Sequence, residues 1–519
     1  MNLLTVVTFV PLLGALAAAL LPRDEAGQHR ALALSVSLLT LALSLGLWLG
    51  FDASAGAAEF QFEEKRAWMQ SIGVGYHVGI DGVALLLVML TTALVPVVIL
   101  SSWQAVQDRV KEFMIAILVL ETAMIGTFAA LDLILFYVFW ELMLIPMYLL
   151  IGVWGGSNRL YATVKFFVYT FAASVLMLLA ILFVYFNDGG TFDYQQARSA
   201  LQVTTEQGRW LFLAFAVKVP MFPLHTWLPD AHTEAPTAGS VILAGVMLKM
   251  GTFGFFRYAM PLFPEATLHF RPLISTLATI GIVYGALMCF VQTDMKRLVA
   301  YSSVSHLGFV MLGLMALSAE GLTGGVYQML NHGVSTGGLF LLVGMLYERR
   351  HSRLLSDYGG IAKSVPWLAT AFVVVTLSSI GLPGTNGFVG EFLILSGTFL
   401  SRLPNGQLLS VVATSGVILG AVYMLVLVEK VFYGPIRHEE NRHLPDLSLR
   451  EGMVMAPIMV FIVVMGLMPG PFLAPAKPAV DRLVQRFQQT EARLGLPSRV
   501  GTVSTAVATR PPPPPGRAN

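Results

Sequence analysis

The chain of 519 residues is 56% hydrophobic and only 12% charged, with a formal net charge of +2. About 25% of an average soluble domain is charged, because a soluble protein needs a polar surface to cover its core. The composition therefore excludes a soluble enzyme, a nucleic-acid-binding protein and a disordered chain. The single cysteine, Cys289, excludes a disulfide framework and protein-bound iron–sulfur clusters.

A helix needs about 20 mostly apolar residues to cross a bilayer. Fourteen segments meet this requirement, so we expect an all-α polytopic membrane protein with about 14 transmembrane helices. The first segment resembles a signal peptide but lacks a basic start, so we interpret it as a retained helix. In chain order the segments are 3–22, 31–50, 81–102, 113–131, 133–153, 163–186, 208–228, 238–260, 271–292, 296–317, 322–347, 365–400 (overlong), 407–433 and 452–470.

The distribution of lysine and arginine predicts the orientation, because inner loops carry more of them. With the N-terminus outside, the inner loops carry sixteen and the outer loops seven. This assignment places Lys296 at a solvated helix start on the inner side, and Arg257 and Arg271 in outer loops. We therefore expect both termini on the outer, periplasmic side, and the composition favours a bacterial inner (cytoplasmic) membrane.

The C-terminal segment 471–519 divides into two parts. Within 479–495, apolar residues recur at roughly helical spacing, which predicts either a surface amphipathic helix or an arm that contacts a partner. These residues are Val480, Leu483, Val484, Phe487 and Leu494. The last stretch, ending in PPPPPGRAN, is polyproline-like and is expected to be disordered.

Six ionisable residues lie deep inside the predicted spans, where a charge costs at least ~2.5–3.5 kcal/mol. They are Glu141, Lys218, Lys249, His306, His332 and Glu391. Pro220 and Pro223 follow Lys218, so this helix should break just past the lysine. The run GLPGTNG, residues 381–387, predicts a second break before Glu391.

Taken singly, each of these residues could be half of a structural ion pair or a packing histidine. Six of them on six helices are spread as a relay requires. Burial destabilises the charged forms of lysine and glutamate, and histidine titrates near neutral pH. The set therefore predicts a path for protons.

Other polar residues could give protons access to the path or bind a cofactor. His225 could belong to a polar access route beside the broken helix, and Asp132 could serve as an interfacial access or exit group. His225 and His232 are seven residues apart, which does not fit a helical metal-ligand pair. Neither GxGxxG nor GxxxxGKS occurs, so we expect no metal and no cofactor in this chain.

The spans fall into two sets of five helices. Helices four to eight cover 113–260 and helices nine to thirteen cover 271–433, with helices one to three (1–112) before them and helix fourteen (452–470) after them. In each set the fourth helix is the broken one. Because five is an odd number, the two sets should be inverted relative to one another, which is a common plan for transporters.

Several segments closely resemble one family over about residues 1–470. They are FYVFWELMLIPMYLLIGVWGG, YATVKFFVYT, KVPMFPLHTWLPDAHTEAPTAGSVILAGVMLKMGTFGFFR, QTDMKRLVAYSSVSHLGFV and GLPGTNGFVGEFLIL. The resemblance is to the subunit M family of respiratory NADH–quinone oxidoreductase (complex I), whose mitochondrial counterpart is the ND-four-type chain. Glu391 favours this family, because the sister antiporter-like subunits typically carry lysine at that position.

The resemblance implies a role for each buried group. Glu141 resembles the fifth-helix glutamate that pairs with Lys218, the lysine of the broken seventh helix. Lys249 resembles the eighth-helix lysine that continues the path. His306 and His332 resemble polar residues of the central hydrophilic axis, and Glu391 the terminal group. We place them in the order Lys218, Lys249, His306, His332, Glu391.

The implied function is a proton-translocating subunit of the membrane arm. NADH oxidation and quinone reduction would take place in partner subunits, which would hold FMN, the iron–sulfur clusters and quinone. The partners would be other complex I subunits, especially neighbouring antiporter-like subunits, together with membrane lipid, and no nucleic acid.

Three alternatives remain open at this point. The first is a proton-path subunit of a multi-subunit sodium/proton antiporter or of a membrane-bound hydrogenase. The second is a structural spacer that holds a membrane arm together. The third is a solitary transporter of an organic substrate, although side chains for recognising such a substrate are missing.

Overall fold

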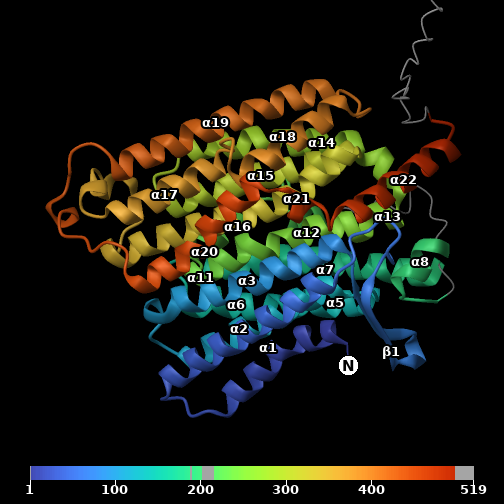
Figure 1. The fold of residues 1–519 in the computed structure, drawn as a ribbon, viewed down its shortest axis with the longest axis horizontal. Coiled ribbons are helices and arrows are strands. Elements are labelled where there is room, and N and C mark those ends of the chain that lie inside the picture. Colours follow the sequence, from blue (N-terminus) through green and yellow to red (C-terminus); the bar gives the residue numbers. More distant parts are fainter. Residues whose placement is uncertain (1, 188–189, 201–214, 497–519) are drawn as a thin grey trace, which may run out of the picture.

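The chain folds into a bundle of long apolar helices that lie roughly side by side (Figure 1). The structure, a computed structural model, describes residues 2–187, 190–200 and 215–496. Within these residues twelve spans are long and apolar enough to cross a membrane. They are α1 (Leu3–Leu20), α2 (Ala26–Gly50), α3 (Gly82–Ala105), α4 (Val110–Ala129), α5 with α6 (Leu133–Leu142 and Leu144–Trp154), α7 (Arg159–Asn187), the series from α11 to α13 (Thr237–Leu262), α14 (Pro264–Phe290), α15 (Met295–Ala316), α16 (Ala319–Arg350), α19 (Gly406–Phe432) and α20 (Leu449–Leu467).

Two predicted spans account for the difference from fourteen. The overlong segment 365–400 forms two short helices, α17 (Pro366–Ser379) and α18 (Asn386–Leu400), which are separated at the predicted break. Most of the segment 208–228 lies outside the described residues. The described part of the chain therefore contains twelve full-length spans and does not establish the predicted count.

A β-hairpin corrects the all-α prediction. Strand β1 (Gln61–Met69) pairs antiparallel with β2 (Val74–Ile80). The hairpin lies at the same end of the bundle as α8 (Tyr194–Ala200) and α22 (Lys477–Arg493) (Figure 1). The sequence did not predict it because Glu63, Glu64, Lys65 and Arg66 interrupt the alternation of apolar and polar residues that identifies a half-buried strand.

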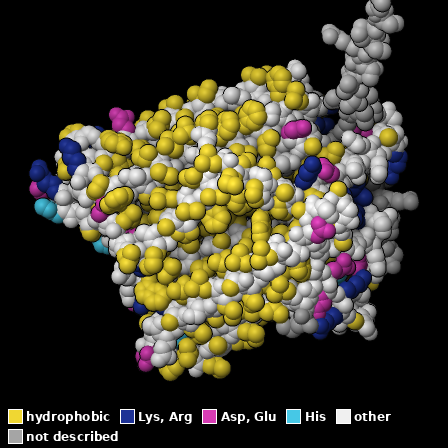
Figure 2. Space-filling model, in the orientation of Figure 1, with side chains coloured by type: hydrophobic (Ala, Val, Ile, Leu, Met, Phe, Trp, Pro, Cys, Tyr) yellow, Lys and Arg dark blue, Asp and Glu magenta, His cyan; other side chains and the backbone are white. Residues whose placement is uncertain are grey.

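Apolar side chains cover the middle of the visible face, and charged side chains gather at its two ends (Figure 2). This arrangement is typical of a membrane protein whose apolar middle band contacts the hydrocarbon core of the bilayer. The helices differ in how much of their surface is available to lipid. In the most hydrophobic window of α15, of α16 and of the series from α11 to α13, all residues are buried, whereas only 28% are buried in that of α2. The buried ionisable residues of the central helices are thus shielded from lipid by the outer ones.

Three basic residues assigned to loops are buried inside the protein. Arg257 is 2% exposed and forms an ion pair of 2.5 Å with Asp81. Arg271 donates to the carbonyls of Met315 and Ala316, which end α15. Lys296, expected at a solvated helix start, is 7% exposed and donates to the Ala235 carbonyl. The assignments were wrong because these helices pack against chain ends that only the tertiary structure brings together.

The predicted amphipathic segment forms α22, which packs on its own chain against α3, α14 and α16. Its residues Val480, Leu483 and Phe487 are buried. Arg486 of the same helix donates to the Pro261 carbonyl at 2.7 Å. Just before α22, a side chain at Gly82 would meet the Pro475 carbonyl oxygen at 1.6 Å, so this approach requires glycine. The polyproline tail lies outside the described residues.

Candidate functional site

Lys218 ends a short helical stretch, and the chain turns immediately after it. Residues 215–218 are helical, and the amide of Val219 still donates to the Phe215 carbonyl at 2.9 Å. Pro220 has no amide hydrogen with which to continue the helix. The next helix, α10 (Trp227–Glu234), begins only after a run of turns. The predicted break just past Lys218 is therefore present.

The Lys218 side chain lies in an aromatic environment. It is 1% exposed, and its Nζ atom has no hydrogen-bond partner among the described residues. This atom lies 5.0 Å from the centre of the Trp140 ring, and Phe215 packs edge-on against the same ring. The ammonium group therefore makes a cation–π contact with Trp140 in place of a hydrogen bond to a described residue.

Glu141, next to Trp140 on α5, is half-buried and interacts electrostatically with Lys218. Tyr137 and Ser174 are the other polar neighbours of its carboxylate. Within the described part of the chain the two groups form no ion pair in direct contact. The structure thus brings the expected glutamate and lysine near one another but leaves them apart.

Lys249 lies between two π-helical segments, η2 (Leu243–Met247) and η3 (Phe255–Ala259), on the short helix α12 (Leu248–Gly254). The side chain is fully buried and donates to the Ala244 carbonyl within the first of these segments. Its Nζ atom also lies 2.6 Å from Nδ1 of His332. Such π-helical segments occur frequently at functional sites because they free backbone groups from the helical ladder.

Gly251 brings the segments of the two lysines into contact. A side chain at this position would lie 2.7 Å from the amide nitrogen of Val219, which directly follows Lys218. Glycine therefore lets α12 approach the broken helix closely. The backbones that carry Lys218 and Lys249 touch, although the two ammonium groups have no direct bond.

Two histidines continue from Lys249 towards Glu391. The rings of His332 on α16 and His306 on α15 have centroids 5.8 Å apart. Nδ1 of His306 lies 3.4 Å from a carboxylate oxygen of Glu391, which α18 carries. The spatial order is Lys249, His332, His306, Glu391. The predicted order placed His306 before His332 and was wrong, because the order of helices along the chain differs from their order in space.

Neutral polar residues surround this chain of groups. The side-chain amide of Gln328 donates to Glu391 at 3.4 Å, and that of Asn331 donates to Gln328 at 3.0 Å. The hydroxyl oxygens of Ser335 and Ser378 lie 2.5 Å apart. These two serines, Gln328, Asn331 and both histidines line a small cavity. The neutral residues were not predicted because only ionisable residues stand out in an apolar span. The spacing of three and four between Gln328, Asn331 and Ser335 on α16 was the available signal, since it puts these three residues on one helix face.

The break between α17 and α18 positions Glu391. Gly381 follows α17 with a φ of +72°, a conformation that favours glycine. A side chain there would lie 2.6 Å from Oε2 of Glu391. The glycine thus provides both the turn and the space for the carboxylate, which is 5% exposed.

The two candidate access groups have different surroundings. His225 is 3% exposed and packs against Phe222 and Tyr284, with ring centroids 5.6 and 5.1 Å away. Asp132 is the N-cap of α5 and accepts hydrogen bonds from the amides of Ile134, Leu135 and Gly75. These contacts give Asp132 a clear structural role, which is to start α5 and to hold the hairpin.

Two further buried ionisable residues do not belong to the predicted path. Glu121, in the middle of α4, is fully buried, and neither carboxylate oxygen has a hydrogen-bond partner among the described residues. A charged residue inside an apolar run was the signal that could have found it. His232 on α10 is also fully buried. In the sequence its spacing from His225 had been interpreted only with respect to metal binding.

Known proteins resemble this chain in sequence and in structure. The family described as "NADH:quinone oxidoreductase/Mrp antiporter, TM" matches residues 130–417. The chain is 45% identical over 503 residues to NADH-quinone oxidoreductase subunit M of Rhodobacter capsulatus, covering 94% of this chain and 97% of the relative. It is 44% identical to NADH-ubiquinone oxidoreductase chain 4 of Marchantia polymorpha, covering 82% and 86%.

Two solved structures share the fold. A chain of respiratory complex I from Thermus thermophilus with bound NADH superposes with a TM-score of 0.85 at 32% identity, covering 93% of this chain and 99% of that one. A chain of the Mrp complex from Dietzia sp. superposes with a TM-score of 0.80 at 20% identity, covering 94% and 100%. The second likeness concerns the fold alone.

Proposed function

Because this chain belongs to the subunit M family of NADH-quinone oxidoreductase, we propose that it is a proton-translocating subunit of the membrane arm of complex I. Partner subunits would oxidise NADH and reduce quinone, and would hold FMN, the iron–sulfur clusters and quinone. Neighbouring antiporter-like subunits and lipid would surround this chain in a bacterial inner membrane. Both termini would lie on the outer side, as the distribution of basic residues predicts.

The observation that carries this proposal is the chain of buried groups from Lys249 to Glu391. Each consecutive pair is close enough for direct proton transfer or for transfer through one water molecule. Four ionisable side chains from α12, α15, α16 and α18 have no reason to meet inside a protein that only holds its neighbours in place, because burying each of them costs free energy.

The relay would begin with a change in the distance between Glu141 and Lys218. At an effective dielectric constant of about 20, separating two unit charges from roughly 4 Å removes up to about 4 kcal/mol of attraction. This loss would favour transfer of the Lys218 proton towards Lys249, across the contact that Gly251 permits. A conformational or electrostatic signal from the partner subunits would supply the change.

The later steps follow the contacts from Lys249 to Glu391. Lys249 would donate its proton to Nδ1 of His332, which must be neutral to accept it. The His332 ring would then release the proton from Nε2 towards His306, and Nδ1 of His306 would pass it to Glu391. The polar cavity beside the two rings has room for bridging water, and its amide and hydroxyl groups would orient that water.

Membership of complex I is tested by a native gel of gently solubilised membranes that contain a tagged chain, stained for NADH dehydrogenase activity. We expect the tag to co-migrate with a large active band. Migration in a smaller complex without that activity, together with sodium-dependent transport, would favour an antiporter subunit instead.

The relay is tested in the same membranes by Lys249→Ala, with the exposed Lys430→Ala as the matched control. Lys249→Ala should lower the number of protons pumped per electron while the complex still assembles. An unchanged ratio in an assembled complex would contradict the relay.

A further inference from the structure

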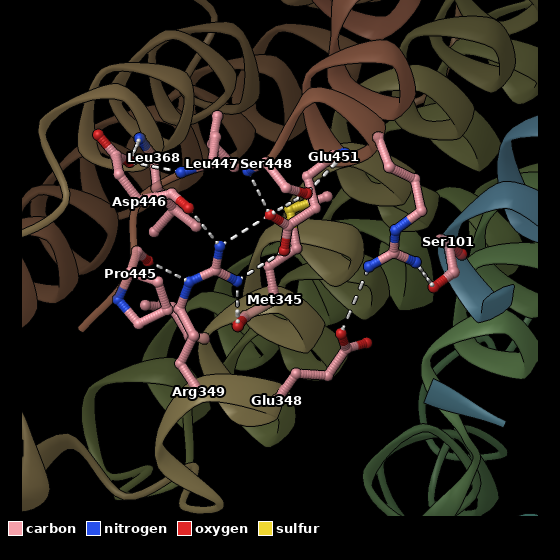
Figure 3. Close-up of polar contacts among 12 residues, drawn as sticks. Ser101, Met345, Glu348, Arg349, Leu368, Pro445, Asp446, Leu447, Ser448 and Glu451 are labelled. Carbon is pink, nitrogen blue, oxygen red and sulfur yellow. Dashed lines mark hydrogen bonds and ion pairs between the residues drawn. The ribbon is translucent and has the colours of Figure 1, made fainter. Parts of the chain in front are cut away.

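The short helix α17 is anchored, at the end away from the break, by the loop that precedes α20 (Figure 3). The amides of Trp367 and Leu368, in its first turn, donate to the two carboxylate oxygens of Asp446 at 2.9 and 3.0 Å. The Asp446 carbonyl accepts from Arg349 of α16 at 3.0 Å (Figure 3). Arg349 also donates to both carboxylate oxygens of Glu451 of α20, at 2.6 and 2.8 Å. Because a bidentate pair holds its partners in one geometry, this end of α17 is fixed to α16 and α20.

At the other end of α17, three polar side chains form a closed ring of hydrogen bonds across the break. The Ser378 hydroxyl, near the end of α17, donates to Oδ1 of Asn386 at 2.5 Å. The side-chain amide of Asn386, the first residue of α18, donates to the Ser335 hydroxyl of α16 at 3.2 Å. The hydroxyl oxygens of Ser335 and Ser378 lie 2.5 Å apart. We refer to these three residues as the clamp, which joins α16, α17 and α18.

The hydrogen bonds of the clamp run in one direction around the ring. A hydroxyl group has one proton, and Ser378 donates its own to Asn386, so the Ser335 hydroxyl donates to Ser378. Hydrogen bonds arranged in this way polarise and strengthen one another. All three side chains are buried, which leaves little access for water to replace a lost member. We therefore expect the loss of one member to disrupt the whole ring.

The two short helices that the clamp joins face opposite nitrogens of the His306 ring. Ser379, the last residue of α17, places its hydroxyl oxygen 3.4 Å from Nε2. Glu391 of α18 places a carboxylate oxygen 3.4 Å from Nδ1. Both distances are near the upper limit for a hydrogen bond, so a small displacement of either helix would break these contacts. The relative position of α17 and α18 therefore determines whether His306 meets its acceptor.

We propose that Asn386 is a positioning residue for the transfer of a proton from His306 to Glu391, because it closes the clamp that holds the start of α18 against α16 and α17. The anchored end of α17 gives the clamp a fixed base. This inference rests on the proposed function and adds the device that aligns its last step. Asn386 itself carries no proton, since an amide does not titrate.

The test uses the assembled complex in proteoliposomes and measures the initial rate of proton pumping driven by NADH. Asn386→Leu keeps the approximate shape of the side chain and removes both of its hydrogen bonds. Ser378→Ala removes one hydroxyl with little loss of volume. Each variant should lower the rate about three- to tenfold, because a misplaced acceptor slows the transfer. The double variant should lose no more than either single variant, since the members of the ring act together.

Matched controls come from the same two helices. Thr376 of α17 and Thr398 of α18 are buried, and neither hydroxyl has a hydrogen-bond partner among the described residues. Thr376→Val and Thr398→Val should leave the pumping rate unchanged. Electron transfer from NADH to a soluble acceptor should be unchanged in every variant, and a native gel confirms assembly. An assembled Asn386→Leu complex with the full pumping rate would overturn the inference.

A conservative variant separates alignment from packing. In Asn386→Asp, a protonated carboxyl group can accept from Ser378 and donate to Ser335, whereas the ionised form can only accept. Other titratable groups beside the clamp include His306 and Glu391, so each rate is compared with that of the unchanged protein at the same pH. Pumping by Asn386→Asp should be close to normal at about pH 6, because burial favours a protonated carboxyl group, and it should fall as the pH rises through the pKa of this group. A deficit at about pH 6 as large as that of Asn386→Leu would contradict a role in hydrogen bonding.

Hydrogen exchange of residues 379–387 measures the clamp without reference to pumping. Asn386→Leu should raise the exchange of this break, and Thr398→Val should not. Faster exchange together with full pumping would mean that the clamp holds the break but does not position Glu391, and this result would overturn the inference.

Glu391→Gln tests the proposed function by itself. If this variant lowers pumping and Asn386→Leu does not, the relay stands and its alignment by Asn386 is wrong. If neither variant lowers pumping in an assembled complex, the proposed function itself is wrong.

Discussion

The two halves of the candidate relay are built differently. Around Lys218, aromatic rings and an unconnected glutamate leave the ammonium group without a hydrogen bond among the described residues. Around Lys249, a direct contact of 2.6 Å leads to His332, and polar side chains from four helices continue to Glu391.

In the proposed relay, this difference would separate the control of proton transfer from its conduction. A charge in an aromatic environment has few interactions, so its free energy depends strongly on the distance to one partner, Glu141. A chain of polar groups in contact distributes each proton over several sites and depends little on any one distance. The Lys218 half is therefore suited to respond to a signal, and the Lys249 half to transmit a proton.

The largest expected effect follows from replacing Lys218. Lys218→Ala should abolish pumping through this subunit, because no other titratable group occupies the controlling position. Lys218→Arg should fail as well, since arginine stays charged and cannot release the proton. Proton-to-electron ratios in proteoliposomes measure both effects. An assembled Lys218→Ala complex with the full ratio would contradict the assignment.

Breaking the conducting half at one histidine should have a smaller effect. His332→Phe removes the acceptor of the Lys249 proton, and we expect pumping to fall strongly. The matched variant Ser379→Ala removes only a 3.4 Å contact to His306, and it should reduce pumping slightly. Equal losses in the two variants would mean that the half works as one rigid unit and not as a chain of sites.

A moderate effect is expected from Trp140→Leu. This change removes the ring beside the Lys218 ammonium group, and such contacts contribute about 0.5–2 kcal/mol. The balance between Lys218 and Glu141 should shift, so the coupling of electron transfer to pumping should change a few-fold. The control is Val138→Ala on the same helix α5, a residue that is 40% exposed, and it should leave the coupling intact. The comparison of regions would fail if both variants behaved alike.

The smallest effect on pumping should come from the hairpin, which lies outside both halves. Nδ1 and Nε2 of His77 contact Asp193 at 3.0 Å and Glu63 at 2.9 Å. Burial alone would lower the pKa of His77, but these hydrogen bonds outweigh it and raise the pKa above 6.5. A raised pKa stabilises the docked hairpin fully below pH 6.5 and loses this contribution as the pH rises through the value in the folded protein.

Hydrogen exchange of residues 61–80 measures this dependence. Protection should be greater at about pH 6 than at about pH 9, and His77→Gln should remove the difference while pumping is unchanged. Burial would raise the pKa of Asp193, but hydrogen bonds from His77 and Lys65 outweigh it and lower the pKa, so the His77–Asp193 pair also loosens at strongly acidic pH. A pH-independent protection pattern would show that the His77 contacts do not hold the hairpin.

Much of this arrangement could be predicted because its signals are local. Apolar runs identify the spans, prolines and glycines identify both breaks, and ionisable residues within apolar runs identify the six residues of the proposed relay. The π-helical segments around Lys249, the order of the two histidines and the burial of Lys296 depend on how helices pack. No window of sequence contains that information. The surroundings of His232 could not be predicted for the same reason, since the ring on which it stacks, Phe340, belongs to another helix.

The close contact between Gly82 and Pro475 has a consequence for biosynthesis. Gly82 begins α3, near the start of the chain, whereas Pro475 leaves the ribosome after all the spanning helices. Until α22 docks, the Gly82 end of α3 stays uncovered and the Arg486 contact with Pro261 cannot form. The contacts of α22 with α3, α14 and α16 therefore form only after every described spanning helix has been synthesised. A chain truncated before α22 would insert into the membrane but would lack the contacts that α22 makes with α3, α14 and α16.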